Sequence, residues 1–467
     1  MRFSIMLVCI MLWVDRESEL GRLNRLLQGR TSALSVVYGR RRIGKTRLLV
    51  EWARQHEGVY TVADQSTPDI QRRYFASAIG QRLEGFGEVE YPDWTVLLSR
   101  LAREARAAKW RGPIVFDELP YLVAASPELP SVLQRWVDHE AKEAQLVVAL
   151  AGSSQRMMQG LVLSASAPLF GRAKEILPLG PLPAGSIPEV FRVRRASDVI
   201  DTFAAWGGVP RYWELASEMQ GSVVDQLEAL VLDPVGALHR EPDRLLLEEL
   251  PPAIELRPVL DAIGAGAHRV SEIAGRLGRP ATSLPRPLDR LLGLGLVAKE
   301  IPFGDSERKS KRSLYKIVDP FIRMWFRVVA PHRAALAAGT KATRKLLLER
   351  YWPALVSTAW EDLCRSAVPR LGDWGPASRW WSKNDPEWDV VSESRDGKRL
   401  LLGEVKWHRE PMSRSELRAA ASELDRRQPP QLSKSYDEIV RMLFVPETTR
   451  RPGENIVVGA EVLNALG

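Results

Sequence analysis

The first two hundred residues alternate short apolar runs with amphipathic stretches. The runs "ALSVVYG", "PIVFDE" and "QLVVALAGSS" consist largely of β-branched and small apolar residues, and they end in glycine, acidic residues and serine. Continuous apolar strands separated by helical patterns are typical of a parallel sheet with helices on both faces. The pattern therefore predicts a doubly wound α/β domain over residues 13–215.

The rest of the chain changes character twice. Residues 216–330 follow a helical pattern and end in two short apolar runs, "GLVAKEIPF" and "SLYKIVDPF", joined by the basic loop "GDSERKSKRS". Residues 331–467 place "EWDVVSES", "KRLLLGEVKW" and "DEIVRMLFVP" as strands between helices. A chain of 467 residues is too long for a single core. We therefore expect three domains with these boundaries.

Charge and cysteine content add modest constraints. The chain has 66 basic and 58 acidic residues, a formal net charge of +8, which is compatible with nucleic acid as a partner. Its two cysteines, Cys9 and Cys364, form neither a disulfide framework nor a metal-binding Cys-x-x-Cys pair. The six histidines are scattered, which argues against a zinc site. A reducing cytoplasm fits this composition.

The N-terminus begins with the apolar run "MRFSIMLVCIMLWV". The run is too short for a membrane span, which needs roughly 20 residues, and no small-residue cleavage site follows it. We expect a buried leading strand and no membrane partner. The alternative is an export signal.

A phosphate-binding motif lies between the first apolar strand and the helical stretch that follows. Gly39 to Thr46 spell G-x-x-x-x-G-K-T. The glycines, Gly39 and Gly44, let backbone N–H groups approach phosphate oxygens. Lys45 is expected to reach the β- and γ-phosphates, and Thr46 to offer its hydroxyl to Mg²⁺. The motif predicts a nucleoside triphosphate and Mg²⁺ as cofactors.

Two later strands end in residues suited to hydrolysis. The strand "PIVFDE" delivers Asp117 and Glu118 to the sheet edge where ligands bind in open α/β sheets. Asp117 is expected to hold Mg²⁺ directly or through water, and Glu118 to polarise the attacking water. Ser153, after the third strand, either touches the γ-phosphate or the water, or caps the next helix. The alternative for the two acids is a solvated strand end.

An ordered set of motifs gives a family resemblance. "WVDRESELGRL", the phosphate-binding loop, "FDELPYL", "LAGSSQRMM", "APLFGRAKEILPLGPL" and "GGVPRYW" follow one another. In this order they resemble the archaeal-type ATPases, which are similar to the AAA+ and STAND branches of the P-loop fold. The later "LYKIVDPFIRMWFRVV" resembles that family's junction into its C-terminal DUF234 domain.

The resemblance implies ATP as the nucleotide and assigns further residues. Val14 to Glu17 would border the adenine, and Pro210 would pack near the base. Arg172 would sense the γ-phosphate, in cis or from a neighbouring subunit of a homo-oligomer. The alternative for Arg172 is a surface ion pair with Glu175.

The middle region resembles a winged helix. "HRVSEIAGRLGRPATSLPRPLDRLLGLGLVAKEI" predicts a helix, a turn, a helix and a strand, and the two β-runs follow. The basic loop between them forms the wing tip, where Arg308, Lys309, Lys311 and Arg312 would face DNA phosphates. Pro285 and Pro287 in the second helix argue against base reading. The module would contact the DNA backbone, or act as an arm that carries nucleotide state onward.

The C-terminal region combines two acids and a lysine on neighbouring strands. Asp389 lies in the first strand, and Glu404 and Lys406 lie on one face of the second because side chains alternate along a strand. Such a set suits metal-assisted phosphodiester cleavage. It resembles the PD-(D/E)xK nuclease core, although Trp388 replaces the usual proline. Glu361, in the preceding helix, would complete a metal site with Asp389 and Glu404.

Alternatives remain open here as well. Glu404 and Lys406 could form a solvated ion pair in a domain that only binds. The sequence thus predicts a multidomain α/β protein: a P-loop ATPase, a winged-helix module and a restriction-endonuclease-like domain. Its expected activity is Mg²⁺-dependent ATP hydrolysis that controls a domain acting on DNA. The alternatives are a non-catalytic switch and a DNA-binding regulator.

Overall fold

The computed structural model describes residues 13–29, 31–153, 158–249, 255–306, 310, 312–383, 385–450 and 453–467. The predicted leading strand up to residue 12 and three wing-tip residues, Arg308, Lys309 and Lys311, lie outside these ranges. The chain forms two compact units, Asp15–Pro181 and Leu182–Gly467, and Val14 belongs to the second. Within the described ranges, no helix is long and apolar enough to cross a membrane.

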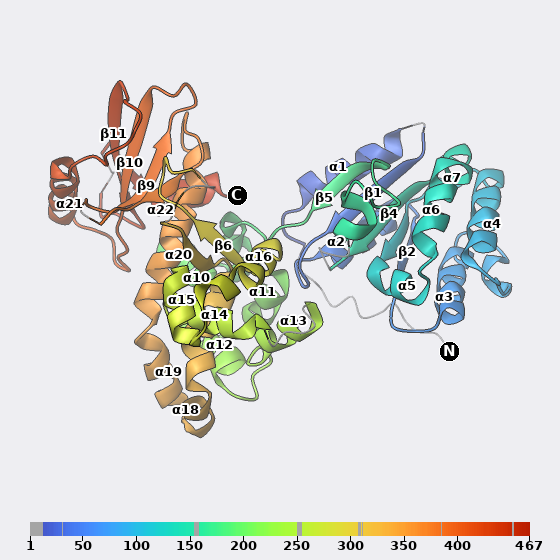
Figure 1. Cartoon of the computed structure of the whole chain (residues 1–467), viewed down its shortest axis with the longest axis horizontal. Coiled ribbons are helices and arrows are strands. Elements are labelled where there is room, and N and C mark those ends of the chain that lie inside the picture. Colours follow the sequence, from blue (N-terminus) through green and yellow to red (C-terminus); the bar gives the residue numbers. More distant parts are fainter. Residues whose placement is uncertain are drawn as a thin grey trace. The chain divides into compact units, whose positions relative to one another are not determined.

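The first unit is built on a five-stranded parallel sheet (Figure 1). Its strand order is β2-β3-β4-β1-β5. The central strands are almost entirely buried, as expected for a sheet covered on both faces. The strands are β1 (Ala33–Tyr38), β2 (Val59–Val62), β3 (Ile114–Asp117), β4 (Val147–Gly152) and β5 (Ala173–Pro178).

Helices follow the strands in the same unit. Helix α1 precedes β1 in the sequence and α2 follows it. Helix α4 packs on α6 and α7 (Figure 1). The helices are α1 (Glu17–Gln28), α2 (Lys45–Gln55), α3 (Pro68–Gly80), α4 (Trp94–Ala107), α5 (Leu119–Ala125), α6 (Leu129–Asp138) and α7 (Glu140–Glu143). The predicted α/β sheet is confirmed.

The position of β4 has a direct consequence for the site. β4 pairs with β1 on one side and with β3 on the other. Because all three strands are parallel, their carboxyl ends meet at one edge of the sheet. The residue after β4 therefore lies between the loop that follows β1 and the acids that end β3.

The second unit begins with a mainly helical part. Three short helices and a two-stranded antiparallel sheet occupy the predicted winged-helix region, and Pro285 starts the third helix. A proline is tolerated at that first position because its N–H would lack an intrahelical partner there. The elements are α10 (Ala196–Trp206), α11 (Pro210–Ser217), α14 (Arg257–Gly264), α15 (Val270–Leu277), α16 (Pro285–Gly293), β6 (Val297–Glu300) and β7 (Leu314–Ile317).

The same unit ends in a second five-stranded sheet, order β12-β11-β10-β9-β8. β10 pairs antiparallel with β9 and parallel with β11, so the sheet is mixed. Figure 1 shows helix α21 beside this sheet. The elements are α17 (Pro320–Met324), α20 (Trp352–Ala367), β8 (Ser378–Trp380), β9 (Trp388–Glu393), β10 (Arg399–Val405), α21 (Arg414–Arg426), β11 (Glu438–Val445), β12 (Ile456–Val458) and α22 (Gly459–Ala465).

The division of the chain differs from the three predicted domains. It falls between Pro181 and Leu182, not at residue 215, and the regions expected to separate at residue 330 pack together. Helix α10 explains this arrangement, because its apolar residues join those of α17, α20 and α22 in one buried cluster. A helical pattern predicts that a helix buries a face, but not which neighbour covers it.

The hairpin of β6 and β7 is joined to α20 by ion pairs. Asp362 of α20 binds Lys316 of β7 at 2.8 Å and Arg323 of α17 at 2.7 Å. It also accepts a hydrogen bond from Arg365 at 2.7 Å. Burial alone would raise the pKa of Asp362, but the three cations outweigh it and hold that pKa well below its usual range.

Arg312, the one predicted wing-tip residue within the described ranges, also forms an ion pair and a hydrogen bond. Arg312 pairs with Asp305 and donates a hydrogen bond to the backbone oxygen of Trp381 at 2.9 Å. The backbone N–H of Phe303 donates to the oxygen of Arg379 in β8 at 2.8 Å. Phe303 and Arg312 therefore lie against the edge of the C-terminal sheet. Arg312 was expected to face DNA phosphates, but in this structure it binds Asp305 and the Trp381 backbone.

We predict that Asp362→Asn destabilises the second unit by about 2–4 kcal/mol, because it leaves three cations without their shared partner. Since the folded pKa of Asp362 is lowered, its contribution is present above the unfolded pKa near 4 and is lost as pH falls below that value. Urea unfolding at pH 7 and pH 3.5 measures both effects. Asp261→Asn, which removes a more exposed partner of Arg257, should cost about 0.5 kcal/mol or less. An equal loss for both variants would contradict the prediction.

Candidate functional site

The loop between β1 and α2 has the backbone that a phosphate site needs. Gly44 precedes α2 with a φ of 92°, a left-handed conformation that favours glycine. A side chain at Gly39 would collide with the backbone oxygen of Leu179. The N–H groups of the first turn of α2, from Lys45, have no partner within the helix, which suits them to bind an anion.

The lysine of the loop is buried and oriented. Lys45 is only 5% exposed, and its Nζ donates to the backbone oxygens of Gly39 at 2.8 Å and Arg40 at 3.0 Å. The loop therefore wraps around the ammonium. An anion bound by the N–H groups of the same loop would lie close to this positive charge.

The hydroxyl of Thr46, the last residue of the phosphate-binding motif, forms a hydrogen bond with Asp117. Thr46 Oγ1 donates to Asp117 Oδ2 at 2.8 Å, and the backbone N–H of Glu118 donates to Asp117 Oδ1 at 2.8 Å. Asp117 is 1% exposed. The side chain of Asp117 is thus fixed by groups on two neighbouring elements.

The second acid of β3 is held by the residue after β4. Ser153 Oγ lies 3.1 Å from Oε1 and 2.9 Å from Oε2 of Glu118. Glu118 itself adopts a left-handed backbone conformation, with φ 52° and ψ 43°. Such strain in a non-glycine residue persists where surrounding contacts impose it, and it is common at functional sites.

These residues suit a magnesium nucleotide. Mg²⁺ usually binds one or two carboxylates together with phosphates and waters, and does not need a cage of protein ligands. Thr46 and Asp117 supply a hydroxyl and a carboxylate beside the phosphate-binding loop. Thr46 and Asp117 therefore fit the Mg²⁺ of the nucleotide that the phosphate-binding motif predicts.

The C-terminal sheet brings a second set of acids together. The register pairs Gly403 with Val390, so one further step sets Glu404 of β10 opposite Asp389 of β9. The backbone N–H of Val405 donates to Asp389 Oδ2 at 2.9 Å. Lys406 Nζ lies 2.9 Å from Glu404 Oε1, which agrees with the expected shared face.

Each acid of this set is engaged by a cation or a backbone group. Glu404 pairs with Arg427 as well as Lys406. Arg365 of α20 lies 3.5 Å from the Glu361 carboxylate and donates to the backbone oxygen of Asp389 at 2.9 Å.

In this structure the acids are held by basic side chains and a backbone group. Across the described ranges, no three carboxylate, histidine or cysteine side chains are arranged to hold a metal ion. Basic side chains contact Glu361 and Glu404, and the metal-binding role expected for Glu361, Asp389 and Glu404 stays a prediction.

Burial and mutual repulsion change the protonation of these acids. Burial raises the pKa of Glu361 to about 7; Arg365 opposes this shift and Asp389 adds to it. Burial also raises the pKa of Asp389, and the facing carboxylate of Glu404 contributes. At neutral pH the set thus carries less negative charge than three isolated acids.

Comparison with known proteins identifies two regions. Residues 13–212 match a family described as an ATPase domain predominantly from Archaea. Residues 13–212 are thus similar to the ATPase domain of this family. Residues 325–421 match DUF234, a family of archaeal and bacterial proteins of unknown function.

Similarity extends beyond the two regions. An uncharacterized protein of Methanocaldococcus jannaschii is 27% identical over 403 residues, which cover 85% of this chain and 88% of that protein. A Walker-type ATPase of Pyrococcus abyssi is 21% identical, with a TM-score of 0.49 over 68% of this chain and 96% of its own. The ORC2 protein of Aeropyrum pernix is 16% identical, with a TM-score of 0.42 over 73% of this chain and 94% of its own.

In the ATPase domain, Arg172 has a partner that the sequence did not predict. Its guanidinium donates three hydrogen bonds to the carboxylate of Asp138 at the end of α6, at 2.8, 2.8 and 3.1 Å. Glu175, the expected alternative partner, instead pairs with Arg22. The role expected for Arg172 in sensing the γ-phosphate stays a prediction.

Other expected residues lie around the same domain. Arg16 of the stretch expected at the adenine donates to the backbone oxygens of Ile43 at 3.1 Å and Gly180 at 2.7 Å. Arg41 donates to the Tyr121 hydroxyl. Pro210 begins α11 in the second unit, and its role beside the base stays a prediction.

Three residues of these sites were not recognised in the sequence. Tyr60 donates a hydrogen bond to Asp117, Arg365 contacts Glu361, and Arg427 contacts Glu404. Tyr60 and Arg427 reach their partners from other elements, so the order of the elements would have been needed to find them. Arg365 lies four residues after Glu361 on the same helix, α20, and this spacing was a signal in the sequence.

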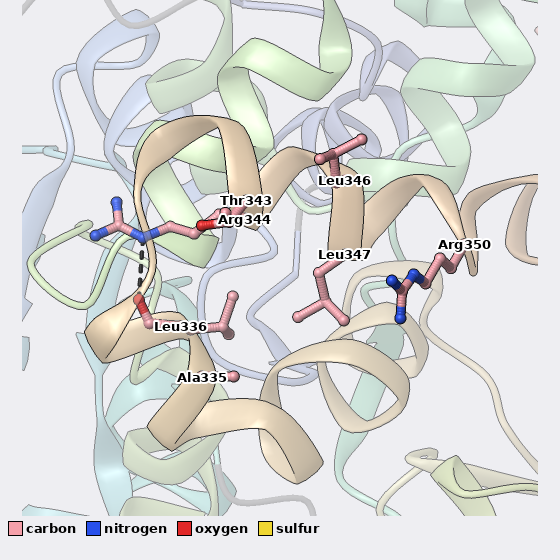
Figure 2. Close-up of a pocket in the computed structure, with 7 residues that line it drawn as sticks. All are labelled: Ala335, Leu336, Thr343, Arg344, Leu346, Leu347 and Arg350. Atoms are coloured by element: carbon pink, nitrogen blue, oxygen red, sulfur yellow. Dashed lines mark hydrogen bonds between the residues drawn. The ribbon is translucent and has the colours of Figure 1, made fainter.

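A surface pocket lies apart from all predicted site residues. Figure 2 shows it between α18 (Arg333–Ala338) and α19 (Lys341–Glu349). Leu336, Leu346 and Leu347 line it together with Arg344 and Arg350. No acid or histidine is among the described residues that line it.

We predict that Ser153→Ala lowers the turnover of ATP roughly tenfold to a hundredfold, because Glu118 loses the hydroxyl that orients it. ATP affinity should change little, since the phosphate-binding loop is intact. Steady-state phosphate release measures both quantities. Ser99→Ala is the matched control, because it removes a serine–glutamate hydrogen bond to Glu140 elsewhere in the domain. Unchanged turnover in Ser153→Ala would contradict the role of Ser153 in orienting Glu118.

Proposed function

We propose that this protein hydrolyses ATP in a Mg²⁺-dependent reaction at the carboxyl edge of the parallel sheet. The observation that carries the proposal is the convergence of two pairs, Thr46 with Asp117 and Ser153 with Glu118, beside the loop that surrounds Lys45. A site that only bound nucleotide would not need an oriented second carboxylate at this edge.

Each residue of the site has a distinct role in this proposal. The N–H groups at the start of α2 and the Lys45 ammonium bind the phosphates. Thr46 and Asp117 would hold Mg²⁺, which when bound offsets phosphate charge. Glu118 accepts a proton from the attacking water, and Ser153 keeps its carboxylate oriented.

A second proposal concerns the control of the C-terminal domain. We propose that nucleotide state changes how that domain acts on DNA. A chain of ion pairs supports a mechanical link: Lys316 of the hairpin binds Asp362, Asp362 binds Arg365, and Arg365 contacts Glu361. The link runs from the predicted winged-helix module to the acid set.

The predicted winged-helix module also has side chains suited to a nucleic acid backbone. Arg276, Arg279 and Arg286 are exposed on and between α15 and α16. Exposed guanidinium groups bind phosphates with little dependence on sequence. The competing hypotheses are a non-catalytic switch, in which the C-terminal domain only binds, and a DNA-binding regulator. A homo-oligomer in which a neighbour supplies Arg172 remains part of the leading hypothesis.

For the ATPase, we predict that Glu118→Gln keeps ATP binding but lowers turnover by roughly a hundredfold or more, because the amide cannot accept the proton. Lys45→Ala should abolish binding. Calorimetry with ATP and Mg²⁺ and a phosphate-release assay separate the two effects. Glu140→Gln, on α7 of the same domain, serves as the control. Normal turnover by Glu118→Gln would show that another group activates the water.

For the C-terminal domain, we predict that the wild-type chain nicks supercoiled plasmid in Mg²⁺ with a rate that depends on added ATP. Asp389→Ala and Lys406→Ala should abolish nicking while ATP turnover is retained. Gel electrophoresis of the plasmid measures the rate. Cleavage that persists in both variants would exclude Asp389 and Lys406 as catalytic residues. Absence of cleavage by the wild type in every nucleotide state would favour the non-catalytic switch. A footprint at one defined sequence would favour the regulator.

A further inference from the structure

The carboxylate of Asp117 receives three hydrogen bonds from three directions. Thr46 and Tyr60 both donate to Oδ2, at 2.8 and 2.7 Å. The backbone N–H of Glu118 donates to Oδ1 at 2.8 Å. An ionised carboxylate offers about four lone-pair directions, so roughly one, on Oδ1, is left for other contacts. The side chain has little freedom to rotate.

Tyr60 lies on β2, a strand that the apolar pattern of the sequence did not predict. β2 pairs with β3 in parallel, with Tyr60 beside Val115 and Val62 beside Asp117. Side chains lean along the strand direction, which allows the Tyr60 hydroxyl to reach the acid two residues further on. The edge strand thus contributes a polar group to the nucleotide site.

The phenol of Tyr60 is the donor in this contact. A carboxylate oxygen has no hydrogen to give, so the hydroxyl of Tyr60 donates to Asp117 Oδ2.

The arrangement also determines what Thr46 can offer. A threonine hydroxyl has one hydrogen and two lone pairs, and Thr46 gives its hydrogen to Asp117. The lone pairs of Thr46 then remain for a cation. If Asp117 turned away, this hydroxyl would no longer be oriented.

We propose that Tyr60 is a positioning residue for Mg²⁺ in the nucleotide site. It holds Asp117 so that Thr46 presents its oxygen, and Asp117 its remaining lone pair, to the cation. The inference rests on the proposed ATPase function and adds a residue outside the phosphate-binding loop and the two acids at the end of β3.

The test replaces Tyr60 with phenylalanine, which removes only the hydroxyl. Binding of a fluorescent ATP analogue is titrated with EDTA and with Mg²⁺, and the ratio of the two affinities gives the enhancement due to the cation. We expect metal-free affinity within twofold of wild type and a roughly tenfold smaller enhancement in Tyr60→Phe, since partners that orient metal ligands usually change metal affinity tenfold or more. The Mg²⁺ concentration for half-maximal hydrolysis should rise by a similar factor.

Tyr91→Phe is the matched control. Its hydroxyl donates to the backbone oxygen of Phe86 at 2.8 Å, a buried tyrosine hydrogen bond in the same unit. This variant should keep the wild-type enhancement.

The outcomes separate the inference from the proposed function. Full Mg²⁺ enhancement in Tyr60→Phe would overturn the role of Tyr60 and leave the ATPase proposal intact. An equal loss of metal-free and Mg²⁺-dependent affinity would also overturn it, because the defect would then lie in nucleotide binding or folding. If the wild type binds no ATP analogue, the proposed function fails and the inference fails with it.

Discussion

The hydrogen bond from Thr46 to Asp117 connects the loop after β1 with the end of β3, two strands that do not pair with each other. β4 lies between them, and Ser153 at its end reaches Glu118. The chemistry proposed for this edge depends on that strand order. If β1 and β3 were neighbours, there would be no strand between them to carry a hydroxyl to the second carboxylate.

The C-terminal sheet follows another constraint, the cost of burying like charges. Asp389 and Glu404 face each other across β9 and β10, and Glu361 lies near them on α20. Carboxylates this close require compensation by cations or by protons. The structure uses both, because Arg365, Lys406 and Arg427 contact the set and the pKa of Glu361 lies near 7.

The sequence predicted the parts of both sites that depend on local spacing. The loop from Gly39 to Thr46, the acids after β3 and the shared face of Glu404 and Lys406 follow from periodicity within one strand or turn. Edge strands β2 and β5 were missed, since β2 has four residues and β5 alternates exposed and less exposed positions. Contacts of Tyr60 and Arg427 depend on which elements are neighbours, and single-sequence patterns do not report that.

The contact between Arg427 and Glu404 limits what an active form of the C-terminal domain could be. Arg427 follows α21, lies 5.2 Å from the centre of the Trp388 ring, and donates to the backbone oxygen of Glu387 at 3.0 Å. The pair is part-buried, with 17% of the Arg427 side chain and 12% of the Glu404 side chain exposed, so separating the two charges leaves each of them poorly solvated. A ligand that separates Glu404 from Arg427 must therefore compensate the charge on both sides, whether the domain has the proposed nuclease role or only binds.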